Sequence, residues 1–282
     1  MIRRMIAACV LALLASIGTA AAQGRLPIFD THVHYGQNDW GPYPAAKVFE
    51  LFDRAGVSRV LASSTPDDGT VRLHQAAPDR VVPILRPYRA GVTSGNWFND
   101  PNLAEYLEGR LKAGYYRGIG EFHLFDAANA GTPQVKRVTE LAVERGIFLH
   151  VHSGAEPIRR LFAIEPRLKI LWAHAGMSEP ADVLGAMLDQ HKQLWTEVSF
   201  RAGSINSGGR IDPLWRAVFE RHPDRVMIGT DTYVTSRWAD YQGLIEEHRG
   251  WLQQLPRPLA ERIAYRNAVA LFGAGNRPDL QE

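Results

Sequence analysis

Short apolar runs alternate with helix-like segments along most of the chain, and this alternation limits the fold more than any other feature of the sequence. It favours parallel β/α units, because parallel strands need a crossover connection between them. Eight such units, in roughly the 250 residues that a TIM-type barrel occupies, predict one (β/α)8 barrel. An open doubly wound sheet has less support, since no glycine-rich phosphate loop follows the first run. The predicted strands are 27–34, 58–63, 80–87, 116–124, 147–152, 169–173, 193–200 and 225–229, and the predicted helices are 45–55, 71–77, 103–113, 133–145, 157–163, 180–191, 213–221, 241–255 and 259–272.

The first 22 residues resemble a secretory signal peptide rather than part of the fold. Arg3 and Arg4 precede an apolar run over 5–17, and the small residues 20–22 offer a cleavage site. The run is shorter than the roughly 20 residues that span a bilayer, so an uncleaved anchor is the weaker alternative. We therefore expect a periplasmic or secreted protein whose single domain covers 23–282, exported by the general or the twin-arginine route.

Charge and cysteine content exclude several functions for the mature chain. Cleavage would remove two of the 32 basic residues and none of the 30 acidic ones, which leaves the two signs balanced. A neutral chain gives no indication of a nucleic-acid or membrane-surface partner. The single cysteine, Cys9, lies inside the predicted signal. Disulfides, a cysteine nucleophile and thiolate metal ligands are therefore not expected.

Six of the ten histidines fall on predicted strands or at their carboxyl ends, where barrels carry their active sites. Alternate residues of a strand share a face, so Asp30, His32 and His34 point the same way. Two imidazoles at this spacing can bind one cation, and imidazole suits zinc and its neighbours in the transition series. The other four histidines fall on predicted helices and are expected at the surface or at helix caps: His74, His191, His222 and His248.

Further candidate ligands end four other predicted strands. Because they come from different strands that would meet over one barrel axis, they can form an open metal site with a position left for water. By alternation, each pair on one strand shares a face. These residues are Glu121 and His123 on the fourth strand, His150 and His152 on the fifth, His174 after the sixth and Asp231 after the eighth.

With these motifs the chain resembles the amidohydrolase superfamily, in particular the amidohydrolase-related branch that also holds decarboxylases and lactonases. Each motif alone is a modest signal, but their order and completeness across nearly the whole mature chain are specific. The matching segments are Asp30-Thr31-His32-Val33-His34, Gly120-Glu121, His152-Ser153-Gly154, His174-Ala175-Gly176, Gly229-Thr230-Asp231 and Asn267-Ala268-Val269-Ala270-Leu271-Phe272.

The resemblance implies that His32 and His34 bind a divalent metal ion. His152 is implied to be a further ligand or a group that polarises the substrate. His174 is implied to bind a second metal or to polarise the substrate and steady an oxyanion. Asp231 is implied to contact the metal or its water and to act as general base and then general acid.

Glu121 leaves the number of metal ions open. It matches a position where some relatives use a carboxylate to ligate or bridge metals, while others carry a lysine or nothing. Zinc is the expected metal, although manganese, iron and cobalt accept the same nitrogen and oxygen ligands. The first expectation is one ion held by His32, His34, His152 and Asp231, and the second is a pair of ions bridged by Glu121.

Candidates for substrate binding are less specific. Arg86, Tyr88 and Arg201 lie at or just beyond strand ends, where an arginine can hold a substrate carboxylate, although loop salt bridges explain them equally well. His123 is a fourth candidate, and Glu197 is expected to support a histidine or an arginine. Six aromatic residues in or near the predicted rim loops either line a pocket or pack the loops: Trp40, Tyr43, Trp97, Phe98, Tyr233 and Trp238.

The leading expectation is an exported metal-dependent hydrolase that cleaves a C–N, ester or lactone bond of a small molecule with a metal-activated water. A metal-dependent decarboxylase of the same branch is the first alternative, because it would use the same ligands. A metal-free lactonase and a non-catalytic exported binding protein are the others. The expected partner is a small-molecule substrate, and a homodimer is compatible with the resemblance.

Overall fold

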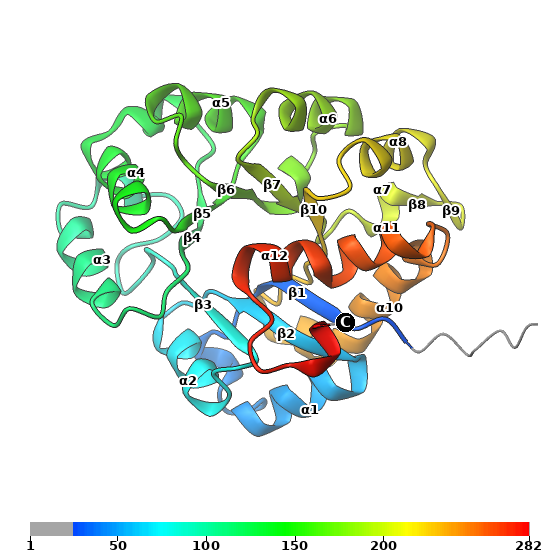
Figure 1. The fold of residues 1–282 in the computed structure, drawn as a ribbon. Coiled ribbons are helices and arrows are strands. Elements are labelled where there is room, and N and C mark those ends of the chain that lie inside the picture. Colours follow the sequence, from blue (N-terminus) through cyan, green and yellow to red (C-terminus); the bar gives the residue numbers. More distant parts are fainter. Residues whose placement is uncertain (1–24, 282) are drawn as a thin grey trace, which may run out of the picture.

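Eight parallel strands follow one another around the barrel in chain order, β1-β2-β3-β4-β5-β6-β7-β10 (Figure 1). The computed structural model describes residues 25–281, so the predicted signal peptide lies outside the described residues. A bridge between Asp30 and Ile228, with the Thr31 amide 2.8 Å from the Ile228 carbonyl, joins the first strand to the last. The predicted (β/α)8 barrel is confirmed. The strands are β1 (Ile28–Val33), β2 (Val57–Ala62), β3 (Val81–Leu85), β4 (Gly118–His123), β5 (Phe148–His152), β6 (Ile170–Trp172), β7 (Leu194–Glu197) and β10 (Val226–Met227).

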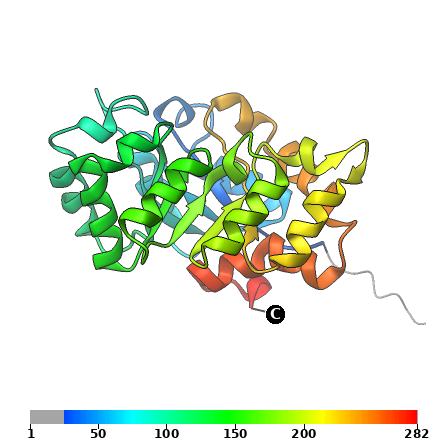
Figure 2. The same ribbon diagram turned by 90° about the horizontal axis from the view of Figure 1, so that it is seen from above.

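The helices surround the barrel, and the C-terminal ones lie across one end of it (Figures 1 and 2). There Phe272 packs on Phe29 and Phe148, with ring centroids 6.3 and 5.0 Å apart, at the start of β1 and β5. The helices are α1 (Ala45–Ala55), α2 (Asp68–Ala76), α3 (Leu103–Leu111), α4 (Pro133–Arg145), α5 (Ala155–Ile164), α6 (Ala181–Gln190), α7 (Ala202–Ile205), α8 (Pro213–Arg221), α9 (Thr235–Ala239), α10 (Tyr241–Leu252), α11 (Arg257–Glu261) and α12 (Asn267–Phe272).

Local sequence explains why these segments take these forms. All five residues of β3 are buried, as expected for a parallel strand covered on both faces. Helix α1 buries Val48, Leu51, Phe52 and Ala55, which lie on one side of the helix, and the left-handed Gly56 ends it. The core therefore forms between the strands and the inner faces of the helices.

The structure departs from the expected elements in several places. The predicted final helix is three segments, since a π-helical turn over Arg262–Arg266 separates α11 from α12. The strand expected to reach residue 200 ends at Glu197, and Phe200, three residues further on, takes a left-handed conformation with a φ of 62°. A two-stranded hairpin of β8 (Asn206–Ser207) and β9 (Arg210–Ile211) was not predicted.

The expectation for the helical histidines is wrong for His248. This side chain is buried, and its Nε2 is 2.9 Å from the Gly229 carbonyl. It lies on the inner face of α10, where a polar ring is tolerated because it is hydrogen-bonded.

None of the helices within residues 25–281 has both the length and the apolar character that crossing a lipid bilayer requires.

Candidate metal centre

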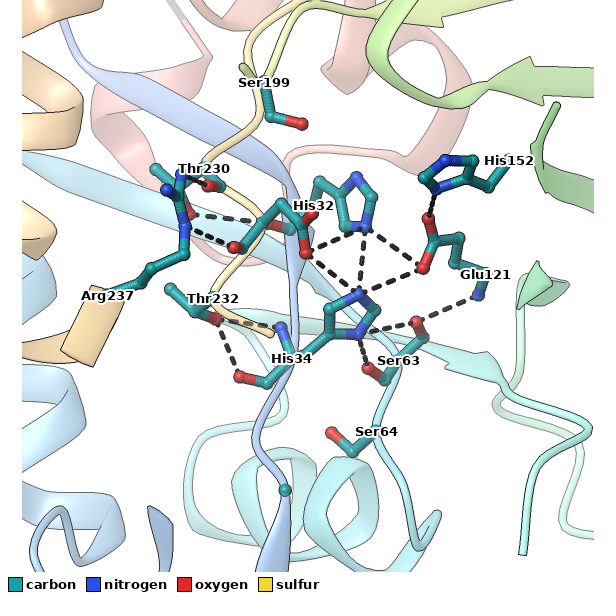
Figure 3. Close-up of polar contacts among 12 residues, drawn as sticks. His32, His34, Ser63, Ser64, Glu121, His152, Ser199, Thr230, Thr232 and Arg237 are labelled. Atoms are coloured by element: carbon teal, nitrogen blue, oxygen red, sulfur yellow. Dashed lines mark hydrogen bonds and ion pairs between the residues drawn. The ribbon is translucent and has the colours of Figure 1, made fainter. Parts of the chain in front are cut away.

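His32 and His34 face each other at the carboxyl end of β1 (Figure 3). The Nδ1 of His32 is 2.9 Å from the Glu197 carboxylate, and the Nδ1 of His34 contacts the Ser63 carbonyl. Both partners are acceptors, so each neutral ring carries its proton on Nδ1. The two Nε2 atoms then face each other only 3.0 Å apart, and each offers a lone pair to a cation when its ring is neutral. A cation between them removes the repulsion that this arrangement would otherwise carry.

Two carboxylates complete this concentration of electron-rich atoms. Oδ1 of Asp231 and Oε2 of Glu121 each lie 3.2 Å from the Nε2 of His34. Oδ1 of Asp231 is buried and has no hydrogen-bond partner among the described residues. An uncompensated buried carboxylate oxygen is costly, and a metal ion would satisfy it.

A second group of donors lies on the other side of Glu121. Its Oε1 is 2.8 Å from the Nδ1 of His152 and 3.4 Å from the Nε2 of His174, and these two nitrogens are 3.1 Å apart. One oxygen of Glu121 thus faces His32 and His34, and the other faces His152 (Figure 3). His174 lies on the same side of Glu121 as His152. The groups His32–His34–Asp231 and Glu121–His152–His174 each have the spacing to hold an ion. The donor set is nitrogen and oxygen only, which fits the divalent transition metals.

Electrostatic forces at the site oppose one another. Burial alone would lower the pKa of His32, but the charges of Asp231, Glu197 and Glu121 raise it well above its usual value. Burial would raise the pKa of Asp231, but the positive charge of a protonated His32 and the close approach of His34 lower it to about 2. The carboxylates are therefore held in the charged form that binds metal.

The loops that carry two of the donors adopt left-handed backbone conformations. His174 has a φ of 56° and Asp231 a φ of 53°, directly after the carboxyl ends of β6 and β10. Such conformations are uncommon for residues with a side chain and concentrate at functional sites. In this barrel they turn both side chains toward the cluster.

Glu197 supports a histidine, as expected from the sequence, since its carboxylate contacts the ring of His32. It also makes contacts that the sequence did not predict. Besides His32, its carboxylate accepts hydrogen bonds from the backbone amides of His174 and Ser199, each at 2.7 Å. Glu197 thereby connects β1, β6 and β7 below the donors.

The other candidates fall into two groups. Arg86 reaches the cluster, with one terminal nitrogen 2.8 Å from Oε2 of Glu121. The Tyr88 hydroxyl is 2.9 Å from Nδ1 of His123, whose ring stacks on His152 at 4.2 Å between centroids. Arg201 instead donates to the Glu179 carbonyl and lies over Trp215, at the outer layer of the barrel. Burial lowers the pKa of His123 to about 4, so this ring is neutral near pH 7.

Two contributors were not predicted from the sequence. The Ser63 carbonyl orients His34, and Arg237 donates to the backbone carbonyls of Asp231 and Thr230 at 2.7 and 2.6 Å (Figure 3). Neither leaves a signal in one sequence, because a carbonyl is common to all residues and the arginine lies in the short helix α9, which carries no motif.

The chain belongs to the amidohydrolase family, since the sequence model of that family matches residues 29–274. Members of this superfamily are in general metal-dependent enzymes, either hydrolases or decarboxylases. No curated protein sequence matches the chain.

Solved structures with the same fold share little sequence with it. A probable 2-pyrone-4,6-dicarboxylic acid hydrolase from Acinetobacter baumannii, with citric acid bound, is 16% identical with a TM-score of 0.60, over 88% of this chain and 100% of that one. The 5-carboxyvanillate decarboxylase from Novosphingobium aromaticivorans, complexed with manganese, is 13% identical with a TM-score of 0.59, over 88% and 94%. A TatD homologue from Escherichia coli is 15% identical with a TM-score of 0.61, over 87% and 97%. At this identity the likeness concerns the fold.

Proposed function

We propose that the protein is a metal-dependent hydrolase that cleaves a C–N, ester or lactone bond of a small molecule. The observation that carries the proposal is the close approach of the Nε2 atoms of His32 and His34, 3.0 Å apart, beside a buried Asp231 oxygen that has no hydrogen-bond partner among the described residues. In such a site a divalent ion lowers the pKa of a bound water and polarises the substrate carbonyl. The order of preference among metals follows from the nitrogen and oxygen ligands, with zinc first and manganese, iron and cobalt as the alternatives.

Residues of the chain transfer the proton, stabilise the oxyanion and orient the histidines. Asp231 accepts the proton of the attacking water and returns it to the leaving group. His174, held through its Nδ1 by the Ser199 hydroxyl at 2.7 Å, steadies the developing oxyanion or binds the second ion. Glu197 and the Ser63 carbonyl keep His32 and His34 in the tautomer that leaves Nε2 available.

The position of Glu121 changes the preferred number of ions. Since its two oxygens face two separate groups of donors, a pair of ions bridged by Glu121 now fits the geometry better than the single ion that was the first expectation. Glu121→Gln is expected to reduce the metal content from two ions to one, because an amide bridges two cations poorly.

A decarboxylase of the same superfamily is the second candidate. Arg86 favours it, because its guanidinium lies at the donor cluster where a substrate carboxylate would approach. The two reactions differ in their products, so carbon dioxide release without uptake of water would select the decarboxylase.

We further propose that the protein is exported after cleavage of residues 1–22 and acts outside the cytoplasm, as a monomer or a homodimer.

The test is elemental analysis of untagged protein comprising residues 23–282, beside a His32→Ala/His34→Ala variant. The wild type should bind metal and the variant should lose it. Asp231→Asn, assayed on amides, esters and lactones, should lower turnover by about 10²- to 10⁴-fold while keeping part of the metal. Wild-type protein that takes up no metal after reconstitution would overturn the proposal and favour the metal-free lactonase or the binding protein.

A further inference from the structure

Large apolar side chains are exposed around the metal centre. Phe125 is 69% exposed, Tyr233 58% and Phe200 44%, and they lie in the loops after β4, β10 and β7. Val234 is exposed beside Tyr233, and Met177 in the connection after β6, whereas Leu214, on α8, is the one exposed large apolar residue of the described chain that lies elsewhere. Because the carboxyl ends of barrel strands surround the active site, these side chains border its entrance.

Two of these rings contact the donor histidines. Phe125 lies 5.8 Å from the His152 ring in an edge-to-face arrangement, and Phe200 lies 5.6 Å from the His174 ring in the same way. Tyr233 continues from Phe200, with its ring centroid 6.0 Å away. An apolar wall therefore begins at the donor atoms themselves and runs outward to solvent.

The placement of Phe200 is maintained by specific contacts. Its backbone is left-handed, with a φ of 62°, which is unfavourable for a bulky residue. The guanidinium of Arg237 covers its ring at 4.1 Å, and the same group holds the carbonyls of Asp231 and Thr230. The ring is thus fixed relative to Asp231, although nearly half of it is exposed.

A groove of about 600 Å³ extends the entrance beyond Tyr233, between the loops that follow β1, β2 and β3. Tyr233 forms part of its wall together with Val234, and polar side chains, among them Asn38, Asp39 and Arg89, form much of the rest. A volume of this size is typical of a small-molecule site.

Three arginines near the entrance already have acceptors, whereas Arg201, which follows Phe200, is buried and has two nitrogens without a hydrogen-bond partner in the described part of the chain. Arg86 donates to the carbonyl and carboxylate of Glu121, Arg89 pairs with Asp100, and Arg237 holds two backbone carbonyls. A substrate carboxylate would have to displace one of these partners. A neutral apolar group would instead bury exposed apolar surface, which is favourable.

We infer that the substrate is an uncharged molecule whose amide, ester or lactone group is attached to an aromatic ring. Phe125 and Phe200, which lie beside different donor histidines of the metal centre, contact this ring. This inference rests on the proposed function. It also distinguishes the chain from the dicarboxylate hydrolase and the carboxyvanillate decarboxylase above, whose names specify acidic substrates.

The test uses three hydroxamates, which bind divalent metals through the same group, with zinc-loaded protein in titration calorimetry. Acetohydroxamate lacks a ring, benzohydroxamate adds one, and 4-carboxybenzohydroxamate adds a charge to it. Benzohydroxamate should bind roughly tenfold more tightly than acetohydroxamate, and the carboxylated ring should bind no more tightly than the plain one. Phe125→Ala and Phe200→Ala should each weaken benzohydroxamate by about 3- to 10-fold and leave acetohydroxamate unchanged.

Leu214→Ala is the matched control, since it removes an equally exposed apolar side chain away from the entrance and should change none of the affinities. Equal affinity for the first two ligands, or tighter binding of the carboxylated one, would overturn the inference while leaving the metal function intact. Failure of acetohydroxamate to bind would instead count against the proposed function. In that case benzamide, observed by saturation-transfer NMR, tests the ring site without metal, and a signal unaffected by Phe125→Ala overturns the inference.

Discussion

Glu197 accepts three hydrogen bonds below the metal centre, from the His32 ring and from the amides of His174 and Ser199. Glu197→Gln keeps the size of the side chain but turns one acceptor oxygen into a donor, which must then face one of these N–H groups. We expect a 10- to 100-fold loss of metal affinity, about the cost of removing such a supporting contact. Competition with a fluorescent chelator measures this affinity. Glu220→Gln, on the exposed face of α8, is the control, and an unchanged affinity in Glu197→Gln would show that His32 does not depend on this carboxylate.

At the scale of elements, β10 can approach β1 and β7 only because residue 229 is glycine. A Cβ at this position would lie 2.1 Å from Oε2 of Glu197 and 2.8 Å from the Cβ of His32. Gly229→Ala should therefore lower the free energy of unfolding by about 1–3 kcal/mol and displace the loop that carries Asp231. Gly109→Ala, inside α3 where a Cβ meets nothing within 4 Å, should instead raise it by about 0.5–1 kcal/mol. Urea denaturation measures both, and equal stabilities for the two variants would contradict the packing argument.

For the whole molecule, the donors come from β1, β4, β5 and the loops after β6 and β10, so a bound ion connects strands from all around the barrel. An ion that binds only the folded chain, at 100 times its dissociation constant, stabilises the fold by about 2.7 kcal/mol. Removing it with a chelator should lower the melting temperature by about 5–10 °C for a chain of this size. The His32→Ala/His34→Ala variant should show no such response in calorimetry. A chelator effect of the same size in that variant would place the stabilising ion elsewhere.

The barrel could be predicted from the sequence, and so could most of the side chains that the structure brings together at the carboxyl ends of its strands. Strand alternation has a period of two, so the shared face of His32 and His34 can be read without coordinates. Asp231 and His174 could be placed at strand ends because each follows a predicted strand. The aromatic residues at the entrance were predicted less accurately. Of the six expected in or near the rim loops, Trp97 and Trp238 are fully buried. The exposed Phe125 and Phe200 were not among the six.

Which side chains of different strands contact each other could be seen only in the folded structure. Glu197 contacts His32 across 165 residues of chain, and Thr232 contacts His34 across 198. These pairings follow from closure of the barrel, which brings the last strand beside the first, and periodicity along one strand carries no information about that closure. The same closure places Glu121 between two groups of histidines, and this placement is the reason we propose a bridged pair of ions in place of the single ion expected from the sequence.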